Sequence, residues 1–200
     1  TMISPGDKVI VEGPTFLATI QCFRLYGAEL ISAPVDGQGV QTDVLEALMA
    51  EHKPKLVYLI PTFGNPSGAT LSLGRRKKVL ELAVKYNTLV VEDDPYGDLY
   101  FGKAPPPSLL ALSKTVPGSR ELLAHCGSLS KVLSPGLRVG WMIAPPELLA
   151  KATMCKQFSD AHTSTFAQAT AAQYLQAGRM PATLAKVRAV YAERAHTMCD

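Results

Sequence analysis

The sequence predicts an α/β protein, a three-layer α-β-α arrangement with a mostly parallel sheet between helices. Short apolar runs typical of buried strands alternate with segments of helical spacing from Lys8 to Tyr96. Such alternation favours right-handed crossover connections, so consecutive strands should run parallel. The chain has 200 residues, of which 47% are hydrophobic, enough to bury the core of one domain.

The first half should contain four strands and three helices. The strands are expected over residues 8–12, 28–35, 55–61 and 88–96, and the helices over residues 16–26, 42–51 and 71–86. Thr15 can cap the first helix and Gly27 can end it, while Thr42 or Asp43 can cap the second. A loop with Asp36 and two glycines should follow the second strand. The nearly unbroken apolar run at 55–61 indicates a strand covered on both faces.

The second half begins with a proline-rich surface loop at residues 103–108. Two more strands are expected at residues 121–127 and 139–144, followed by helices at 147–158, 163–176 and 181 to the end. Pro181 suits the first position of the last helix. That helix reaches the terminus without a stop signal, so the sequence is interpreted as part of a longer one.

Composition narrows the functional classes. No apolar run reaches the ~20 residues of a membrane span, and no secretory signal opens the chain, so a cytoplasmic location without membrane partners is expected. The net charge is only +3, and the short basic run at residues 75–78 reads as a solvated helix start, so no nucleic-acid partner is expected from this segment. The four cysteines lack paired spacing and indicate reduced thiols, with neither a disulfide framework nor a metal site.

Polar, turn-rich segments follow three of the apolar strands. They are Gly64–Gly68, Asp93–Tyr96 and the segment Gly127–Trp141, which contains Lys131. In open parallel sheets, ligands bind beyond the carboxyl ends of the strands. These three distant segments should therefore converge on one edge of the sheet.

The segment around Lys131 can hold both a phosphate and an aldehyde. Ser128 and Ser130 offer hydroxyl donors, and Arg138 offers a guanidinium that forks onto phosphate oxygens. A lysine beside cationic and dipolar groups and away from bulk water has its ammonium form disfavoured, and its amine can then act as a nucleophile. The combination suggests a Schiff base between Lys131 and pyridoxal phosphate.

The other two segments and the start of the first helix can serve the cofactor ring. Asp93 can face the ring nitrogen and keep it protonated. Tyr96 and Asn65 can contact the phenolic oxygen, and Phe16 can lie over the ring plane. Taken singly, an Asn-Pro turn, a helix-capping Asp-Asp-Pro and a core Phe16 explain the same residues equally well. Their joint occurrence in this order favours the cofactor interpretation.

With these motifs in place, the chain resembles the fold-type I pyridoxal-phosphate enzymes, specifically the class I/II aminotransferases. The resemblance covers the whole chain and rests on the motifs Pro-Gly-Asp-Lys-Val-Ile-Val-Glu-Gly-Pro-Thr-Phe, Gly-Asn-Pro-Ser-Gly, Asp-Asp-Pro-Tyr, Ser-Leu-Ser-Lys and Pro-Gly-Leu-Arg-Val-Gly. It implies that Lys131 carries the internal aldimine and moves a proton between the substrate α-carbon and the cofactor C4′. It further implies catalytic roles for Asp93 and Tyr96, and a cis bond between Asn65 and Pro66.

The resemblance assigns the cofactor-binding residues one by one. Asp93 pairs with the pyridine nitrogen, and the other binding residues are Phe16, Asn65, Tyr96, Ser128, Ser130, Lys131 and Arg138. The reaction implied is transfer of an amino group from an L-amino acid to a 2-oxo acid. A homodimer is implied by the resemblance alone, because the family's active sites form between two subunits.

Within the family, the spacing from Lys131 to Arg138 and the segment Gln157–Ser164 resemble the 2-aminoadipate and kynurenine aminotransferase branch. The aminotransferase-like domain of MocR regulators shares the Ser-Lys-x-Leu-x-Pro-x-Leu-Arg pattern. Family members are about twice as long, so residues 1–200 are expected to be the cofactor-binding large domain alone, without the family's N-terminal segment and C-terminal small domain. Residues from about 180 to 200 are expected to form the helix that leads to the small domain. A MocR-type effector domain and a fold-type I decarboxylase, lyase or synthase remain the alternatives, and the amino acid substrate cannot be read from the sequence.

Overall fold

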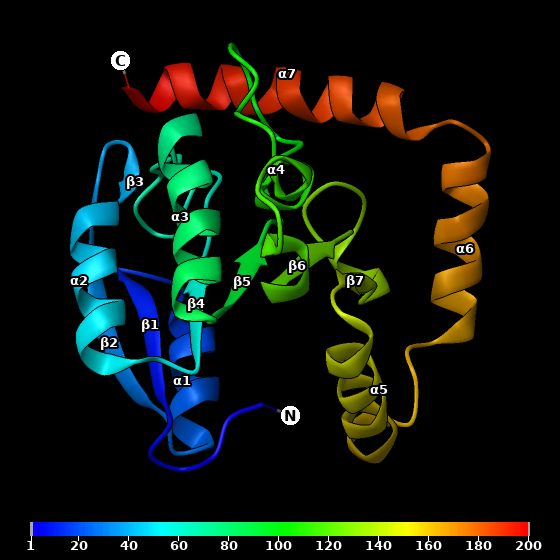
Figure 1. The fold of residues 1–200 in the computed structure, drawn as a ribbon. Helices are drawn as coiled ribbons and strands as arrows, with labels where there is room; N and C mark the ends of the chain where they lie inside the picture. The colour runs from blue at the N-terminus through cyan, green and yellow to red at the C-terminus, as the bar shows by residue number, and fades with distance from the viewer. Residues whose placement is uncertain (1, 200) are drawn as a thin grey trace.

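The computed structural model describes residues 2–199. Its centre is one seven-stranded sheet in the order β3-β2-β1-β4-β5-β6-β7, with helices on both faces (Figure 1). The strands are β1 Lys8–Gly13, β2 Glu29–Asp36, β3 Gly39–Val40, β4 Leu56–Leu59, β5 Leu89–Asp93, β6 Leu123–Ser128 and β7 Gly140–Ile143. The predicted three-layer α/β class is confirmed.

The five central strands run parallel, and the two edge strands do not. β2, β1, β4, β5 and β6 pair in parallel, whereas β3 pairs antiparallel with β2 and β7 pairs antiparallel with β6. The expectation of a loop after β2 was wrong at residues 39–40, which form β3 in a tight hairpin with Val35 and Asp36. Two residues carry too little periodicity for a strand to be predicted.

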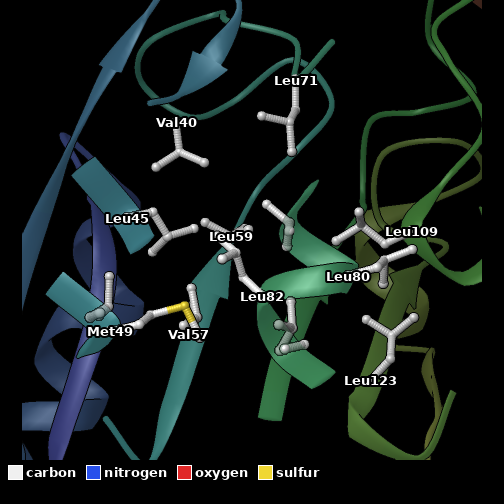
Figure 2. Close-up of a cluster of buried hydrophobic side chains, with 14 of the residues drawn as sticks. Val40, Leu45, Met49, Val57, Leu59, Leu71, Leu80, Leu82, Leu109 and Leu123 are labelled. Atoms are coloured by element: carbon white, nitrogen blue, oxygen red, sulfur yellow. The ribbon is translucent and has the colours of Figure 1, made fainter. Parts of the chain in front are cut away.

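The larger hydrophobic core lies on the face of the sheet covered by α2 Thr42–His52, α3 Leu73–Tyr86 and α4 Leu109–Leu112. Figure 2 shows how Val57 and Leu59 of β4 meet Leu45 and Met49 of α2 and side chains of α3. The opposite face is covered by α1 Leu17–Leu25, where a smaller cluster surrounds Tyr58. Successive residues of a strand alternate between the two clusters, as a pleated strand requires.

Helix ends differ from the sequence expectations in detail. α1 follows Phe16 rather than Thr15, and α2 follows Gln41 rather than Thr42 or Asp43; neither capping residue makes a side-chain hydrogen bond to its helix. The expected caps were therefore wrong, and the Thr15 hydroxyl is instead buried with no hydrogen-bond partner among residues 2–199. The predicted stop at Gly27 is confirmed, because its positive φ of 75° and its N–H bond to the Arg24 carbonyl end α1.

The last third of the chain is helical, with α5 Pro146–Asp160, α6 Thr165–Gln176 and α7 Met180–Cys199. In the view of Figure 1, α5 and α6 lie on the β7 side of the sheet, and α7 runs across the top. α5 and α7 contain no buried residue, and α6 buries only Ala167 and Ala171. Three short 3-10 turns complete the structure at Ser113–Thr115, Ser119–Leu122 and Pro135–Leu137. No helix among residues 2–199 is both long and apolar enough to cross a membrane.

Candidate functional site

The predicted site residues follow the carboxyl ends of four adjacent strands. Phe16 follows β1, Asn65 follows β4, Asp93 ends β5, and Lys131 follows β6. These strands are neighbours in the order β1-β4-β5-β6 and all run parallel. The topology therefore gathers the predicted segments at one edge of the sheet, as the sequence analysis expected.

Asp93 occupies the centre of this edge. It pairs in register with Cys126 of β6, two residues before Ser128, and its Oδ2 accepts a hydrogen bond of 2.5 Å from the Tyr58 hydroxyl. Burial raises the pKa of the Asp93 carboxyl, while the Tyr58 bond and the charge of His125 oppose that rise. A half-buried carboxylate of this kind is kept ionised by hydrogen-bond donors or by a cationic partner.

Tyr58 is a site residue that the sequence analysis missed. It lies in β4, is 4% exposed, and its hydroxyl oxygen also accepts a bond of 3.2 Å from the Thr19 hydroxyl of α1. Burial and the adjacent Asp93 carboxylate raise the pKa of Tyr58, so its hydroxyl stays protonated and donates. The available signal was a tyrosine inside a run expected to be buried on both faces, because a buried phenol needs a polar partner.

The loop after β4 presents Asn65. The bond between Asn65 and Pro66 is cis, which confirms the prediction. The loop is closed by backbone bonds from Gly64 to the Ala69 carbonyl (2.9 Å) and from Gly68 to the Gly64 carbonyl (2.6 Å). The strand that leads into this loop, β4, pairs in parallel with β5, the strand that carries Asp93.

Arg76 holds both ends of that loop and was also missed by sequence reasoning. Its side chain is fully buried and donates to the carbonyls of Leu71 (2.8 Å) and Pro61 (2.7 Å) and to the Thr62 hydroxyl (2.9 Å). Burial lowers the pKa of the Arg76 guanidinium, and the charges of Glu92 and Asp94 partly restore it. The basic run at residues 75–78 had been interpreted as a solvated helix start, which is wrong for this residue.

Glu92 fixes the opposite face of β5. This fully buried carboxylate accepts bonds from the backbone N–H groups of Leu109 (2.6 Å) and Leu110 (3.0 Å) and contacts His125 Nδ1 at 2.8 Å. Burial lowers the pKa of His125, but the bond to Glu92 and its charge outweigh that effect and raise it. Asp93 therefore extends from a strand that is anchored on its other side.

The segment with Lys131 forms a compact turn after β6. Ser128 Oγ accepts the Ser130 N–H at 3.1 Å, and the Leu129 N–H bonds to the Val139 carbonyl at 3.0 Å, which brings Arg138 beside the start of the turn. The flanking side chains of Leu129 and Val132 are buried, whereas Lys131 itself is exposed. The expectation that this lysine lies away from bulk water does not hold among the described residues, because only its neighbours pack inward.

Two further residues complete the edge. Phe16 is 41% exposed at the start of α1, so its ring remains available to a ligand. In the paired strands β6 and β7, a Cβ on Gly127 would lie 2.3 Å from Cζ2 of Trp141, so a larger residue there would require the Trp141 ring to move. Trp141 therefore lies against the strand that leads into the Lys131 turn.

The arrangement can bind a phosphorylated aromatic aldehyde. A carboxylate ends β5, and an amine with hydroxyl and guanidinium donors comes from the end of β6 and the turn after it, while Asn65 follows β4 and Tyr96 follows β5. The chemistry of this donor set matches the three reactive groups of such a ligand. The individual roles of these residues stay predictions.

The family model described as aminotransferase class I and II matches residues 1–200. An aromatic-amino-acid aminotransferase from Thermococcus litoralis is 38% identical, over 98% of this chain and 47% of its own length.

Solved structures give the same result. The structure of Pyrococcus horikoshii kynurenine aminotransferase in complex with PMP superposes with a TM-score of 0.94 and 37% identity, over 99% of this chain and 49% of its own. The α-aminoadipate aminotransferase LysN from Thermus thermophilus, complexed with N-(5'-phosphopyridoxyl)-L-leucine, superposes with a TM-score of 0.93 and 38% identity, over 99% and 50%. The chain therefore spans about half the length of the relatives it matches.

Proposed function

The chain belongs to the class I and II aminotransferases, and from that membership we propose that it is the cofactor-binding part of a pyridoxal-phosphate-dependent transaminase. The reaction is transfer of an amino group from an L-amino acid to a 2-oxo acid. Residues 1–200 form the large domain in this proposal, and α7 leads toward a further domain. The half-length match to the relatives supports this division.

One observation carries the proposal: a carboxylate, an amine, and hydroxyl and guanidinium donors lie at the ends of adjacent strands β5 and β6 and in the turn that follows. The residues present fit pyridoxal phosphate. Asp93 matches a protonated ring nitrogen, Lys131 matches the aldehyde, and the phosphate is matched by hydroxyl and guanidinium donors from Ser128, Ser130 and Arg138. The relative complexed with a phosphopyridoxyl amino acid supports the same cofactor.

When bound, pyridoxal phosphate supplies an electron-accepting ring that stabilises the negative charge left when a proton leaves the substrate α-carbon. Asp93 holds a proton on the ring nitrogen. Asn65 and Tyr96 orient the phenolic oxygen, and Phe16 covers one face of the ring. With the cofactor bound, Lys131 Nζ would accept the proton from the substrate α-carbon and deliver it to C4′, acting as the general base and then as the general acid.

Transamination is favoured over the other reactions of the fold by the names of the relatives. Both structures at 37–38% identity and the sequence relative at 38% are aminotransferases. The substrates are therefore proposed as an amino acid and a 2-oxo acid, without a choice of side chain.

A homodimer in the cytoplasm completes the proposal. Large apolar side chains on the C-terminal helices are exposed, namely Met154 at 53%, Phe158 at 86% and Phe166 at 79%. Large exposed apolar side chains on these helices support an interface with another chain. Four free cysteines support a reducing compartment.

The test is an absorbance spectrum of the complete polypeptide after addition of pyridoxal phosphate. A band of the bound cofactor should form in the wild type and in Lys156→Ala, a control lysine on α5 paired with Asp160, and should be absent in Lys131→Ala. Addition of amino acids should then convert the band to that of the pyridoxamine form. A spectrum that does not depend on Lys131 contradicts the cofactor site. A cofactor band that no amino acid converts contradicts transamination and favours the alternative of a MocR-type regulator domain.

A further inference from the structure

Tyr58 is placed with unusual precision beside Asp93. Its ring packs in the cluster with Val9 and Val11 and meets the Phe23 ring edge to face, with centroids 5.8 Å apart and an interplanar angle of 77°. Thr19 and Phe23 lie four residues apart in α1 and therefore share one face of that helix. One helix face thus holds the Tyr58 ring through Phe23 and the Tyr58 hydroxyl through Thr19.

The hydrogen bonds around Tyr58 form a chain with one direction. The Thr19 hydroxyl donates to the Tyr58 oxygen at 3.2 Å, and the Tyr58 hydroxyl donates to Asp93 Oδ2 at 2.5 Å. An ionised carboxylate can only accept, so Tyr58 must donate to it, and Tyr58 must in turn accept from Thr19. Tyr58 occupies one carboxylate oxygen, which leaves Oδ1 for a second partner.

We propose that Tyr58, oriented by Thr19, is a positioning residue that keeps Asp93 ionised and directs its free oxygen to the ring nitrogen of the cofactor. This inference rests on the proposed pyridoxal-phosphate site. It adds two residues, one in β4 and one in α1, to the machinery that controls protonation of the ring.

The surroundings of Asp93 explain why such a residue is needed. From β6 the carboxyl is faced by the charge of His125 and by the thiol of Cys126, whose pKa burial raises to about 11, so the thiol is neutral. From β1, the Glu12 carboxyl acts on Tyr58. His125 bonds to Glu92 rather than to Asp93. Tyr58 is therefore the side chain that donates directly to Asp93 among the described residues.

Removal of the Tyr58 hydroxyl has two predicted consequences. Asp93 loses a donor in a desolvated position, so ionisation of its carboxyl becomes harder and cofactor binding weakens. In Tyr58→Phe, the dissociation constant of pyridoxal phosphate should rise roughly tenfold, as expected for loss of a hydrogen bond to a charged group. The more basic carboxylate should also draw the proton away from the ring nitrogen.

The experiment uses the complete polypeptide loaded with pyridoxal phosphate labelled with ¹⁵N in the ring. The ¹⁵N chemical shift reports protonation of that nitrogen, and a change in folding stability alone does not move it. Tyr58→Phe should shift the signal toward the unprotonated value, and Thr19→Val should shift it less in the same direction. Tyr174→Phe is the matched control, because it removes a hydroxyl that pairs with Thr183.

The outcomes separate this inference from the proposed function. An unchanged ¹⁵N shift and an unchanged cofactor affinity in Tyr58→Phe, with a wild type that binds the cofactor through Lys131, would overturn the role of Tyr58 alone. An equal effect in Tyr174→Phe would show that the change is not specific to Asp93 and would also overturn it. A wild type without a Lys131-dependent cofactor signal would overturn both proposals.

Discussion

Two arginines, one on a helix that covers the sheet and one on a C-terminal helix, differ in how their side chains are held. Arg76 of α3 is fully buried and satisfies the carbonyls of Pro61 and Leu71. Arg188 of α7 is partly exposed, stacks on the Tyr100 ring at 3.9 Å and donates to the Asp98 carbonyl at 2.7 Å. The buried arginine fixes backbone that carries a site residue, whereas the outer one attaches a helix that buries no residue of its own. The sheet and the helices that cover it are therefore held in place by their own buried contacts. The C-terminal helices are held by few buried contacts.

The largest effect is expected where the buried network is broken. Arg76→Met should lower the free energy of unfolding by about 3–5 kcal/mol, because four acceptors, including the Pro107 carbonyl at 3.4 Å, lose a donor inside the protein. Arg188→Met should cost about 1 kcal/mol or less, since its contacts are near solvent. Denaturant unfolding of the two variants measures the difference. Equal costs would contradict the contrast between the regions.

The second effect concerns Glu12, a buried acid at the end of β1 that accepts the Ile60 N–H at 2.8 Å. Burial raises the pKa of Glu12 to about 7 from an ordinary 4.5, and the Ile60 bond opposes that rise. Between pH 4.5 and pH 7 the Glu12 carboxyl therefore keeps its proton in the folded state and loses it in the unfolded state. The contribution of Glu12 to the free energy of unfolding is complete below pH 4.5 and is lost as the pH rises to 7. The loss is of order 3 kcal/mol.

Glu12→Gln isolates that contribution. The variant has no carboxyl to ionise, so the difference in unfolding free energy between variant and wild type should increase from pH 4.5 to pH 7 and then level off. Equilibrium unfolding at a series of pH values measures it. Burial also raises the pKa of Asp93 and Asp94, so these two groups change the stability of the wild type with pH in the same direction as Glu12 does. Subtracting the variant's unfolding free energy from that of the wild type removes their effect. A flat difference curve would show that Glu12 is ionised in the folded protein throughout.

The smallest effect on stability is expected on the outer helices. Phe158→Ser should change the free energy of unfolding of the monomer by within about 0.5 kcal/mol, because the side chain is 86% exposed. If α5 faces a second copy, the same change should weaken self-association. Sedimentation velocity across a concentration series tests this, with Lys151→Ser on the same helix as a control. Unchanged association in Phe158→Ser would remove this residue from the interface.

The strands and helices could be predicted from the sequence better than the buried side-chain contacts that hold the site residues in place. Strands and helices with long apolar periodicity were found, and the Asn65-Pro66 bond was predicted by family resemblance. The buried position of Arg76 could not be predicted, because a run of basic residues does not indicate which of its side chains is directed into the core. The hydrogen bonds of Tyr58 could not be predicted for a related reason, because its partners Thr19 and Asp93 lie 39 and 35 residues away in the chain. Long-range pairings of this kind depend on strand order, which local patterns do not encode.

The candidate site draws on segments from Phe16 to Arg138, joined through the pairing of β1, β4, β5 and β6. A ligand that requires all four strand ends binds only the folded chain, so it shifts the folding equilibrium by mass action. At a free concentration one hundred times its dissociation constant, such a ligand adds about 2.7 kcal/mol to stability. Supply of the vitamin-derived cofactor would then govern how much of the protein survives proteolysis in the cell, as well as how much of it is active.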